Sequence, residues 1–140
     1  MEKLKVRDIM STDLVTLKED DDLGLAENVM RFGRIRHLPV VTNGKLVGLV
    51  THRDILRAQV SSLADLPLED RNELKLSIPA REIMKKDIET ISPDETVLDA
   101  AKILKENKYG CLPVVNNRKL IGIITEADFI DLVIRALENQ

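Results

Sequence analysis

Two segments of the chain carry the same chemically useful residues at the same spacing. Residues 48–54 have the pattern Gly-x-x-Thr-x-x-Asp, and residues 122–128 repeat it. The pattern offers a hydroxyl, a carboxylate and free backbone N–H groups in one small region. An aspartate can accept hydrogen bonds from both cis hydroxyls of a ribose, and a helix N-terminus with nearby cations can hold a phosphate. These segments therefore suggest the binding of a sugar and a phosphate.

The same residues also fit a simpler interpretation as helix caps. Thr51 with Asp54, and Thr125 with Asp128, have the spacing at which a hydroxyl and a carboxylate cap the first turn of a helix. The repetition does not decide between the two interpretations, because a cap would be repeated as well. Both remain open at this point.

The duplication extends far beyond these two segments. Residues 6–58 align with residues 80–132 without a gap, at an offset of 74, and 17 of the 53 aligned pairs are identical. The strongest shared motifs are Arg-Asp/Glu-Ile-Met, at residues 7–10 and 81–84, and Leu-Pro-Val-Val, at residues 38–41 and 112–115. The chain therefore consists of two copies of one unit.

The first half of each copy predicts a short strand followed by a helix. Residues 15–17 are β-prone, and the acidic run at residues 19–22 suits a helix N-terminus. In the second copy, residues 92–95 read Ser-Pro-Asp-Glu, which predicts a helix with Ser92 as its N-cap. Apolar residues then recur on one helical face at Val97, Ala100, Ala101 and Leu104.

The second half of each copy predicts a hairpin and a further helix. Two β-prone runs surround Asn43-Gly44, which indicates a tight turn, and residues 116–118 take that role in the second copy. Thr51 and Thr125 stand where the next helix should begin. The predicted order in each copy is strand, helix, strand, strand, helix.

These elements predict an α+β fold of two repeats that pack pseudo-symmetrically through their sheets, because a unit of about 53 residues is marginal alone. We expect the first repeat at residues 1–58, a partly ordered linker with an extra helix at residues 59–79, and the second repeat at residues 80–140. The last helix has a wide apolar stripe, which indicates an oligomer interface. Its members are Phe129, Ile130, Val133, Ile134 and Leu137.

The composition disfavours several classes of function. Asp and Glu number 24 against 21 Lys and Arg, and the aromatic residues are two Phe and one Tyr without Trp. The chain thus has neither the basic field nor the stacking rings of a general nucleic-acid binder. Its longest apolar runs are far shorter than the roughly 20 residues that span a bilayer. With one Cys and a charged N-terminus, we expect a cytoplasmic protein.

Catalysis and metal binding are also disfavoured. No motif pairs a nucleophile with a base, and the two histidines lack the spacing of metal ligands. Cys111 has neither a second cysteine nor a matching histidine in its repeat, so we interpret it as a small buried filler.

The joint pattern resembles a tandem pair of CBS domains, the Bateman module, over residues 6–58 and 80–132. The resemblance rests on the opening Asp-Ile-Met, on Leu-Pro-Val-Val, on Gly-x-x-Thr-x-x-Asp and on the order of strands and helices. A narrower similarity, to stand-alone CBS proteins called acetoin-utilisation proteins, rests on residues 35–37, 58–63 and 110–113 and on the apolar last helix.

The resemblance implies that adenosine-containing ligands bind in two clefts between the repeats and that the protein forms a flat homodimer. Such ligands are AMP, ADP and ATP, and in some members S-adenosylmethionine or NAD-type molecules. Matched residue by residue, Asp54 and Asp128 correspond to the aspartates that bind ribose. Thr51 and Thr125 correspond to the hydroxyls near the sugar or phosphate.

The resemblance also implies which further residues line the clefts. The segments before Leu-Pro-Val contribute Arg36 and His37 in the first copy and Gly110 and Cys111 in the second. Adenine would lie between side chains from the early strand of the opposite repeat. These are Met84, Ile88 and Glu89 for the Asp54 cleft and Met10, Leu14 and Val15 for the Asp128 cleft.

The two predicted sites differ in charge. Arg36, His37, His52 and Arg53 surround the first motif, whereas Gly110, Cys111, Glu126 and Ala127 stand at the equivalent places of the second. Because cations favour a phosphate, we expect a phosphate-bearing ligand at Asp54. The Asp128 site would then be empty, weaker or filled by a less charged adenosine compound. A simpler interpretation makes the arginines solvated surface charges and the histidines ordinary polar neighbours.

The sequence thus predicts a regulatory module, without enzymatic activity or a required cofactor, that binds an adenine nucleotide (AMP, ADP or ATP) and signals to an unidentified partner protein. The alternative is a protein-interaction or dimerisation module whose nucleotide clefts are vestigial.

Overall fold

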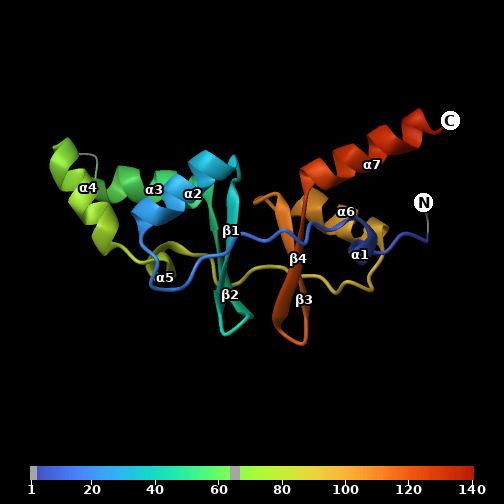
Figure 1. Cartoon of the computed structure of the whole chain (residues 1–140), viewed down its shortest axis with the longest axis horizontal. Coiled ribbons are helices and arrows are strands. Elements are labelled where there is room, and N and C mark those ends of the chain that lie inside the picture. The colour runs from blue at the N-terminus through green and yellow to red at the C-terminus, as the bar shows by residue number, and fades with distance from the viewer. Residues whose placement is uncertain (1–2, 64–66) are drawn as a thin grey trace. The chain divides into compact units, whose positions relative to one another are not determined.

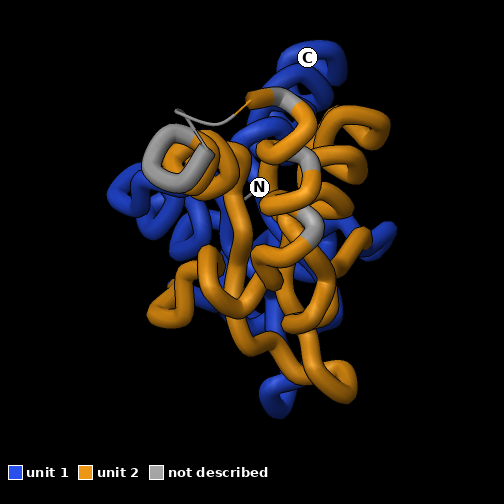
Figure 2. The backbone as a smooth tube through the Cα atoms, turned by 90° about the vertical axis from the view of Figure 1, so that its left-hand side faces the viewer, with its two compact units in different colours: residues 1–14, 89–140 blue, residues 15–88 orange. Residues whose placement is uncertain are grey.

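The computed structural model describes residues 3–63 and 67–140 of the chain. The elements shown in Figure 1 are α1 (Val6–Ile9), α2 (Leu23–Gly33), β1 (His37–Thr42), β2 (Lys45–Thr51), α3 (His52–Leu63), α4 (Leu68–Ser77), α5 (Ala80–Ile83), α6 (Val97–Glu106), β3 (Cys111–Asn116), β4 (Lys119–Thr125) and α7 (Glu126–Glu138). The chain forms two compact units, drawn in two colours in Figure 2. One comprises residues 15–88 (the 15–88 unit), and the other comprises residues 1–14 with residues 89–140 (the 89–140 unit).

Each unit combines most of one repeat with the opening segment of the other. Val6 of α1 is buried in the core of the 89–140 unit, and its N–H donates to the carbonyl of Glu95 at 2.8 Å. Ala80 of α5 takes the equivalent place in the 15–88 unit, where its N–H donates to the carbonyl of Asp21 at 2.7 Å. The sequence repeat and the compact units therefore divide the chain at different residues.

Both predicted hairpins are confirmed. β1 and β2 pair antiparallel, as do β3 and β4, and the two pairs have equivalent registers. Asn43 and Gly44 both have positive φ, 54° and 80°, which is the conformation of a two-residue turn that matches the twist of its strands. Asn117 and Arg118, with φ of 51° and 69°, form the equivalent turn in the second hairpin. The order of elements in the repeats thus agrees with an α+β fold.

The predicted early strands are reduced to single bridges. Leu17 bridges Val40 in parallel, and Ile91 bridges Val114 in the same way. Each bridge places a buried aliphatic side chain at the base of its unit's core. Each predicted early strand therefore pairs with its hairpin at one residue only.

The prediction of Ser92 as a helix N-cap is wrong. α6 begins at Val97, and its N-cap is Thr96, whose hydroxyl accepts from the N–H of Asp99 at 3.1 Å. The carbonyls of Pro93 and Glu95 instead accept hydrogen bonds from the backbone of α1. Because these carbonyls are used by a segment distant in sequence, the residues that carry them do not start a helix.

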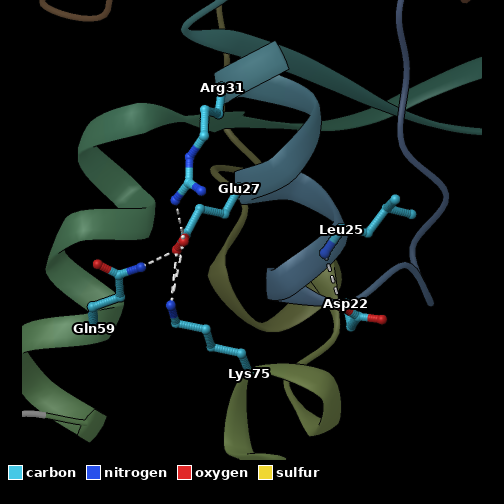
Figure 3. A network of polar contacts seen from close by, with 6 residues as sticks. All are labelled: Asp22, Leu25, Glu27, Arg31, Gln59 and Lys75. Carbon is cyan, nitrogen blue, oxygen red and sulfur yellow. Dashed lines mark hydrogen bonds and ion pairs between the residues drawn. The ribbon is translucent and has the colours of Figure 1, made fainter. Parts of the chain in front are cut away.

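The segment between the repeats contains the expected extra helix, α4. Glu27 of α2 anchors this helix, because its carboxylate pairs with Lys75 of α4 at 3.2 Å (Figure 3). The same carboxylate accepts from Arg31 at 3.3 Å and from the side-chain amide of Gln59 of α3. A half-buried glutamate thus connects three helices of the 15–88 unit.

The apolar stripe of α7 is exposed for most of its length. Ile130, Val133 and Leu137 are 60%, 54% and 62% exposed, whereas Phe129 packs against the core of the 89–140 unit. Figure 1 shows α7 continuing directly from the end of β4. Phe129 therefore belongs to the core and not to the exposed stripe.

Within the described residues, no helix combines the length and the apolar character that a membrane crossing needs.

Candidate functional site

The first Gly-x-x-Thr-x-x-Asp pattern lies where β2 meets α3, and the segment after α5 holds this junction in place. Leu49 and Lys85 exchange both backbone hydrogen bonds, at 2.9 and 2.8 Å. A Cβ atom on Gly48 would lie 2.4 Å from the sulfur of Met84 and 3.0 Å from the carbonyl oxygen of Lys85. A side chain at position 48 would therefore force Met84 and the Lys85 carbonyl to shift, which glycine avoids.

The second pattern has the same framework in the 89–140 unit. Ser11 and Ile123 exchange both backbone hydrogen bonds, at 2.9 and 3.0 Å. A Cβ atom on Gly122 would lie 2.6 Å from the sulfur of Met10 and 3.1 Å from the carbonyl oxygen of Ser11. The glycine of each motif is thus explained by packing, and the two strand–helix junctions are built alike.

Asp54 is a buried carboxylate that caps α3. One of its oxygens, Oδ2, accepts from the N–H and from the hydroxyl of Thr51, each at 2.9 Å. The N–H of Asp54 in turn donates to the Thr51 hydroxyl oxygen at 3.2 Å. Both residues are buried: Asp54 is 7% exposed and Thr51 is 5% exposed. The helix-cap interpretation is therefore confirmed here, and contact with a ligand remains a prediction.

The other oxygen of Asp54 pairs with a residue that the sequence analysis did not select. The ammonium of Lys85 lies 2.5 Å from Oδ1 of Asp54. The lysine side chain is about a third exposed. The only signal for it in the sequence is its place directly after the Arg-Glu-Ile-Met motif, where the first copy has Ser11. Lys85 thus adds a fifth cationic or basic side chain to the Asp54 site.

Asp128 has fewer partners than Asp54. It caps α7 together with Thr125, whose N–H donates to Oδ2 of Asp128 at 2.9 Å. Partial burial raises the pKa of Asp128, Asp131 raises it further, and the Thr125 hydrogen bond opposes the rise. No ion pair joins Asp128 to a cation among the residues that the structure describes. The two aspartates therefore share the cap but differ in their electrostatic surroundings.

The structure places the other basic residues of the first site in the same unit as Asp54. Arg36, His52 and Arg53 are exposed, and His37 is half-buried at the start of β1. The N–H of His52 donates to the carbonyl of Arg36 at 2.9 Å, which brings the end of the α2–β1 loop beside the start of α3. Met84 and Ile88 are half-buried and belong to this unit as well.

The equivalent residues of the second site carry no cation. Gly110 has a φ of 71°, and its N–H donates to the side-chain oxygen of Asn107 at 3.2 Å. Cys111 is fully buried, and burial raises the pKa of its thiol to about 12. This agrees with the interpretation of Cys111 as a core filler. Glu126 and Ala127 are exposed on the first turn of α7.

The residues predicted to flank adenine divide between the units. Met10 and Leu14 are half-buried in the 89–140 unit with Asp128, as Met84 and Ile88 are in the other. Glu89, however, belongs to the 89–140 unit, where its N–H donates to the hydroxyl of Tyr109 at 2.8 Å. Val15 belongs to the 15–88 unit and is 47% exposed. Their participation in the sites remains a prediction.

An open cavity of about 710 Å³ shares Met84 with the first predicted site, but Asp54 and Thr51 are not among its lining residues. Its lining residues are Glu19, Val47, Arg81, Glu82, Met84 and Lys86. Met84 and Lys86 face this cavity, whereas Lys85 between them reaches Asp54, as expected for alternating side chains of an extended segment.

The described part of the chain contains no group of three or more His, Cys, Asp or Glu side chains that could hold a metal ion.

The repeated junction, with its capping aspartate and its paired opening segment, has a counterpart in a known family. Residues 6–61 and 80–135 match the family model of the CBS domain. This chain belongs to the CBS domain family. The recognition of two tandem CBS domains from the sequence is therefore confirmed.

Three similar proteins illustrate the family. A CBS domain-containing protein of Dictyostelium discoideum is 36% identical over 138 residues, which cover 97% of this chain and 95% of that protein. A Vibrio cholerae protein assigned to acetoin utilization (AcuB) has a TM-score of 0.83 and 37% identity, over 96% of this chain and 93% of that one. The CBS domain pair of protein MJ0100 was solved with 5′-methylthioadenosine and S-adenosyl-L-methionine. It has a TM-score of 0.77 and 28% identity, over 94% of this chain and 97% of that one.

Proposed function

We propose that this CBS protein is a regulatory module that binds adenosine-containing ligands and transmits the bound state to a partner protein. One observation carries the proposal: both units present a capping aspartate at a strand–helix junction against which a second segment is paired. The ligands of the similar MJ0100 pair, which contain adenosine, support the same class for this chain.

The residues of the 15–88 unit favour a ligand with a phosphate group. Oδ1 of Asp54 would accept from the ribose hydroxyls, while Oδ2 keeps its cap. Arg36, His37, His52 and Arg53 would surround the phosphate, because charge-assisted hydrogen bonds to a phosphate are roughly twice as strong as neutral ones. The site therefore fits AMP, ADP or ATP as a regulatory ligand.

The Asp128 site fits a less charged ligand. Gly110, the buried Cys111, Glu126 and Ala127 provide no cation, and Asp128 itself sits where burial disfavours its charge. An uncharged compound such as 5′-methylthioadenosine matches these surroundings better than a nucleotide does. We propose that the protein binds these ligands without turnover, since the Cys111 thiol is buried and protonated and Asp54 is engaged by its cap.

Thermal unfolding with a panel of ligands tests this function. The panel contains AMP, ADP, ATP, S-adenosylmethionine, 5′-methylthioadenosine and NADH, with a sample free of nucleotide as the control. A ligand that binds only the folded state raises its stability by RT ln(1 + [L]/Kd), about 2.7 kcal/mol at a hundredfold excess over Kd. We expect AMP, ADP or ATP to raise the melting temperature. A flat response to every adenosine compound at millimolar concentration would refute the proposal.

The exposed stripe of α7 supports a second candidate function, that of a dimerisation or interaction module with vestigial nucleotide sites. Ile130, Val133, Ile134 and Leu137 expose about half of their surfaces or more. We propose that this stripe contributes to a homodimer. Light scattering at tens of micromolar protein should give twice the monomer mass of 15.8 kDa, and Leu137→Asp should reduce it to the monomer mass, whereas the polar neighbour variant Glu138→Gln should not. A monomer in the unmodified protein would rule the dimer out.

A further inference from the structure

Both oxygens of the Asp54 carboxylate have partners before any ligand arrives. Oδ2 accepts two hydrogen bonds from Thr51, and Oδ1 lies 2.5 Å from the ammonium of Lys85. A carboxylate oxygen has two lone pairs, so a ribose that approaches Asp54 meets the lysine at the only oxygen that is not already used by the cap. Any ligand at this aspartate must therefore share Oδ1 with the ammonium or displace it.

The cost of displacement depends on what the ligand offers to Lys85. The lysine side chain is about two-thirds buried, and Asp54 is buried, so separating the two charges without a replacement leaves both poorly solvated. A nucleoside brings hydroxyls for Asp54 but no anion for the ammonium. A nucleotide brings both, because its phosphate oxygens can take over the lysine.

We propose that Lys85 is a specificity-determining residue of the Asp54 site, which makes binding at Asp54 conditional on a phosphate in the ligand. This inference rests on the proposed function and deepens it by naming the ligand class. Lys85 disfavours uncharged nucleosides and cationic adenosyl compounds at this site, since neither offers its ammonium a new anionic partner.

The second repeat provides the internal comparison for this role. The residue paired with Ile123, equivalent to Lys85 paired with Leu49, is Ser11. A serine hydroxyl neither competes for Asp128 as a cation nor requires an anion when a ligand arrives. Position 85 therefore adds to the charge difference made by Arg36, His37, His52 and Arg53, and its lysine is the cation that contacts the aspartate itself.

Titration calorimetry with AMP and with adenosine tests the assignment. The wild-type protein, Lys85→Met and Lys86→Met are compared, each in an Asp128→Ala background so that only the Asp54 site is titrated. Lys86 is the matched control, because it is the adjacent lysine and lines the open cavity instead of contacting Asp54. Melting curves of each variant show that it is folded before titration.

We expect the wild-type site to prefer AMP to adenosine by about a hundredfold or more, and Lys85→Met to reduce this ratio at least about tenfold. The reduction comes from both ligands: AMP binds more weakly because a cation is lost, and adenosine binds more tightly because Oδ1 is vacated. Lys86→Met should keep the wild-type ratio. In a protein with Asp54 and Asp128 intact, Ser11→Lys should tighten AMP at the weaker site.

The outcomes separate this inference from the proposed function. If the wild-type site binds AMP and folded Lys85→Met keeps the same ratio of AMP to adenosine affinity, the role of Lys85 is wrong while nucleotide binding stands. Equal reduction by Lys86→Met would also overturn it, since the effect would then be one of overall charge. If neither AMP, adenosine nor any other adenosine compound binds the wild type, the proposed function fails and Lys85 has no such role.

Discussion

The β2–α3 and β4–α7 junctions have almost the same framework and different chemistry. Both have a glycine against which a methionine packs, a backbone bridge to an opening segment, and an aspartate that caps the helix. Around Asp54 there are a buried threonine, a paired lysine and four basic neighbours, whereas Asp128 is half-buried beside Asp131.

The comparison shows which parts of the repeat are constrained by the fold and which are free to vary. The glycine and the cap serve the packing of each junction, so both copies retain them. The side chains around the aspartate differ in charge between the two copies, although the backbone framework is the same. Identical motif residues therefore do not imply identical ligands, and four experiments test how far the two sites differ.

The largest expected effect is on stability when each aspartate is removed. Asp54→Ala leaves the buried Thr51 N–H and the Lys85 ammonium without partners, which should cost about 2–4 kcal/mol of unfolding free energy. Asp128→Ala removes only a cap from a half-buried position and should cost about 1 kcal/mol. Urea denaturation measures both. Equal losses would show that the Lys85 pair adds nothing to the cap.

The second largest expected effect is on AMP affinity, which should fall in Asp54→Ala but not in Asp128→Ala. Asp54→Ala should weaken AMP binding by about 1.5–3 kcal/mol, since charge-assisted hydrogen bonds to the ribose are lost. Asp128→Ala should spare the tight site. Titration calorimetry of both variants beside the wild type measures this. If the Asp128 replacement abolishes the tight site and the Asp54 replacement spares it, the assignment of the sites is reversed.

The two motif glycines should behave alike, because they belong to the shared framework. Gly48→Ala and Gly122→Ala each force a methionine and a backbone carbonyl to move, which should cost about 1–3 kcal/mol of unfolding free energy. Gly33→Ala is the control, since its added Cβ would have only ordinary contacts with Ile35, the nearest at 3.5 Å. Thermal and urea unfolding measure the three variants. A neutral Gly48→Ala would contradict the close approach of Met84.

The smallest effect is the pH dependence at Asp128. Its folded-state pKa is raised, so the protonated form is favoured in the fold; the resulting stability is present below the unfolded pKa of about 3.9 and is lost as pH rises through the raised folded value. Asp128→Asn cannot titrate. The unfolding free energy of the wild type minus that of this variant should therefore increase as pH falls from 7 to 4. A decrease would mean that the folded pKa is depressed instead.

Local patterns predicted the parts of the fold that depend on neighbours in sequence. The turn at Asn43-Gly44, the start of α3 after Thr51 and the apolar face of α6 all follow from short-range geometry, and the structure has each of them. Two local predictions failed: the early strands are single bridges, and Ser92 is not an N-cap because carbonyls in its segment pair with α1 far away in the chain. The capping pattern at residues 92–95 did not predict the helix start, because the hydrogen bonds from α1 to this segment join residues far apart in the sequence.

The sequence by itself determined that this protein is a duplicated CBS pair, where its hairpins and caps lie, and that the two copies differ in charge around a common aspartate. Only the tertiary structure decided at which residues the compact units divide the chain and that Lys85 pairs with Asp54, 31 residues away. The reason is physical. Turn and cap preferences act over a few residues, whereas the backbone pairing that brings Lys85 beside β2 depends on which segment best fills the core of each unit.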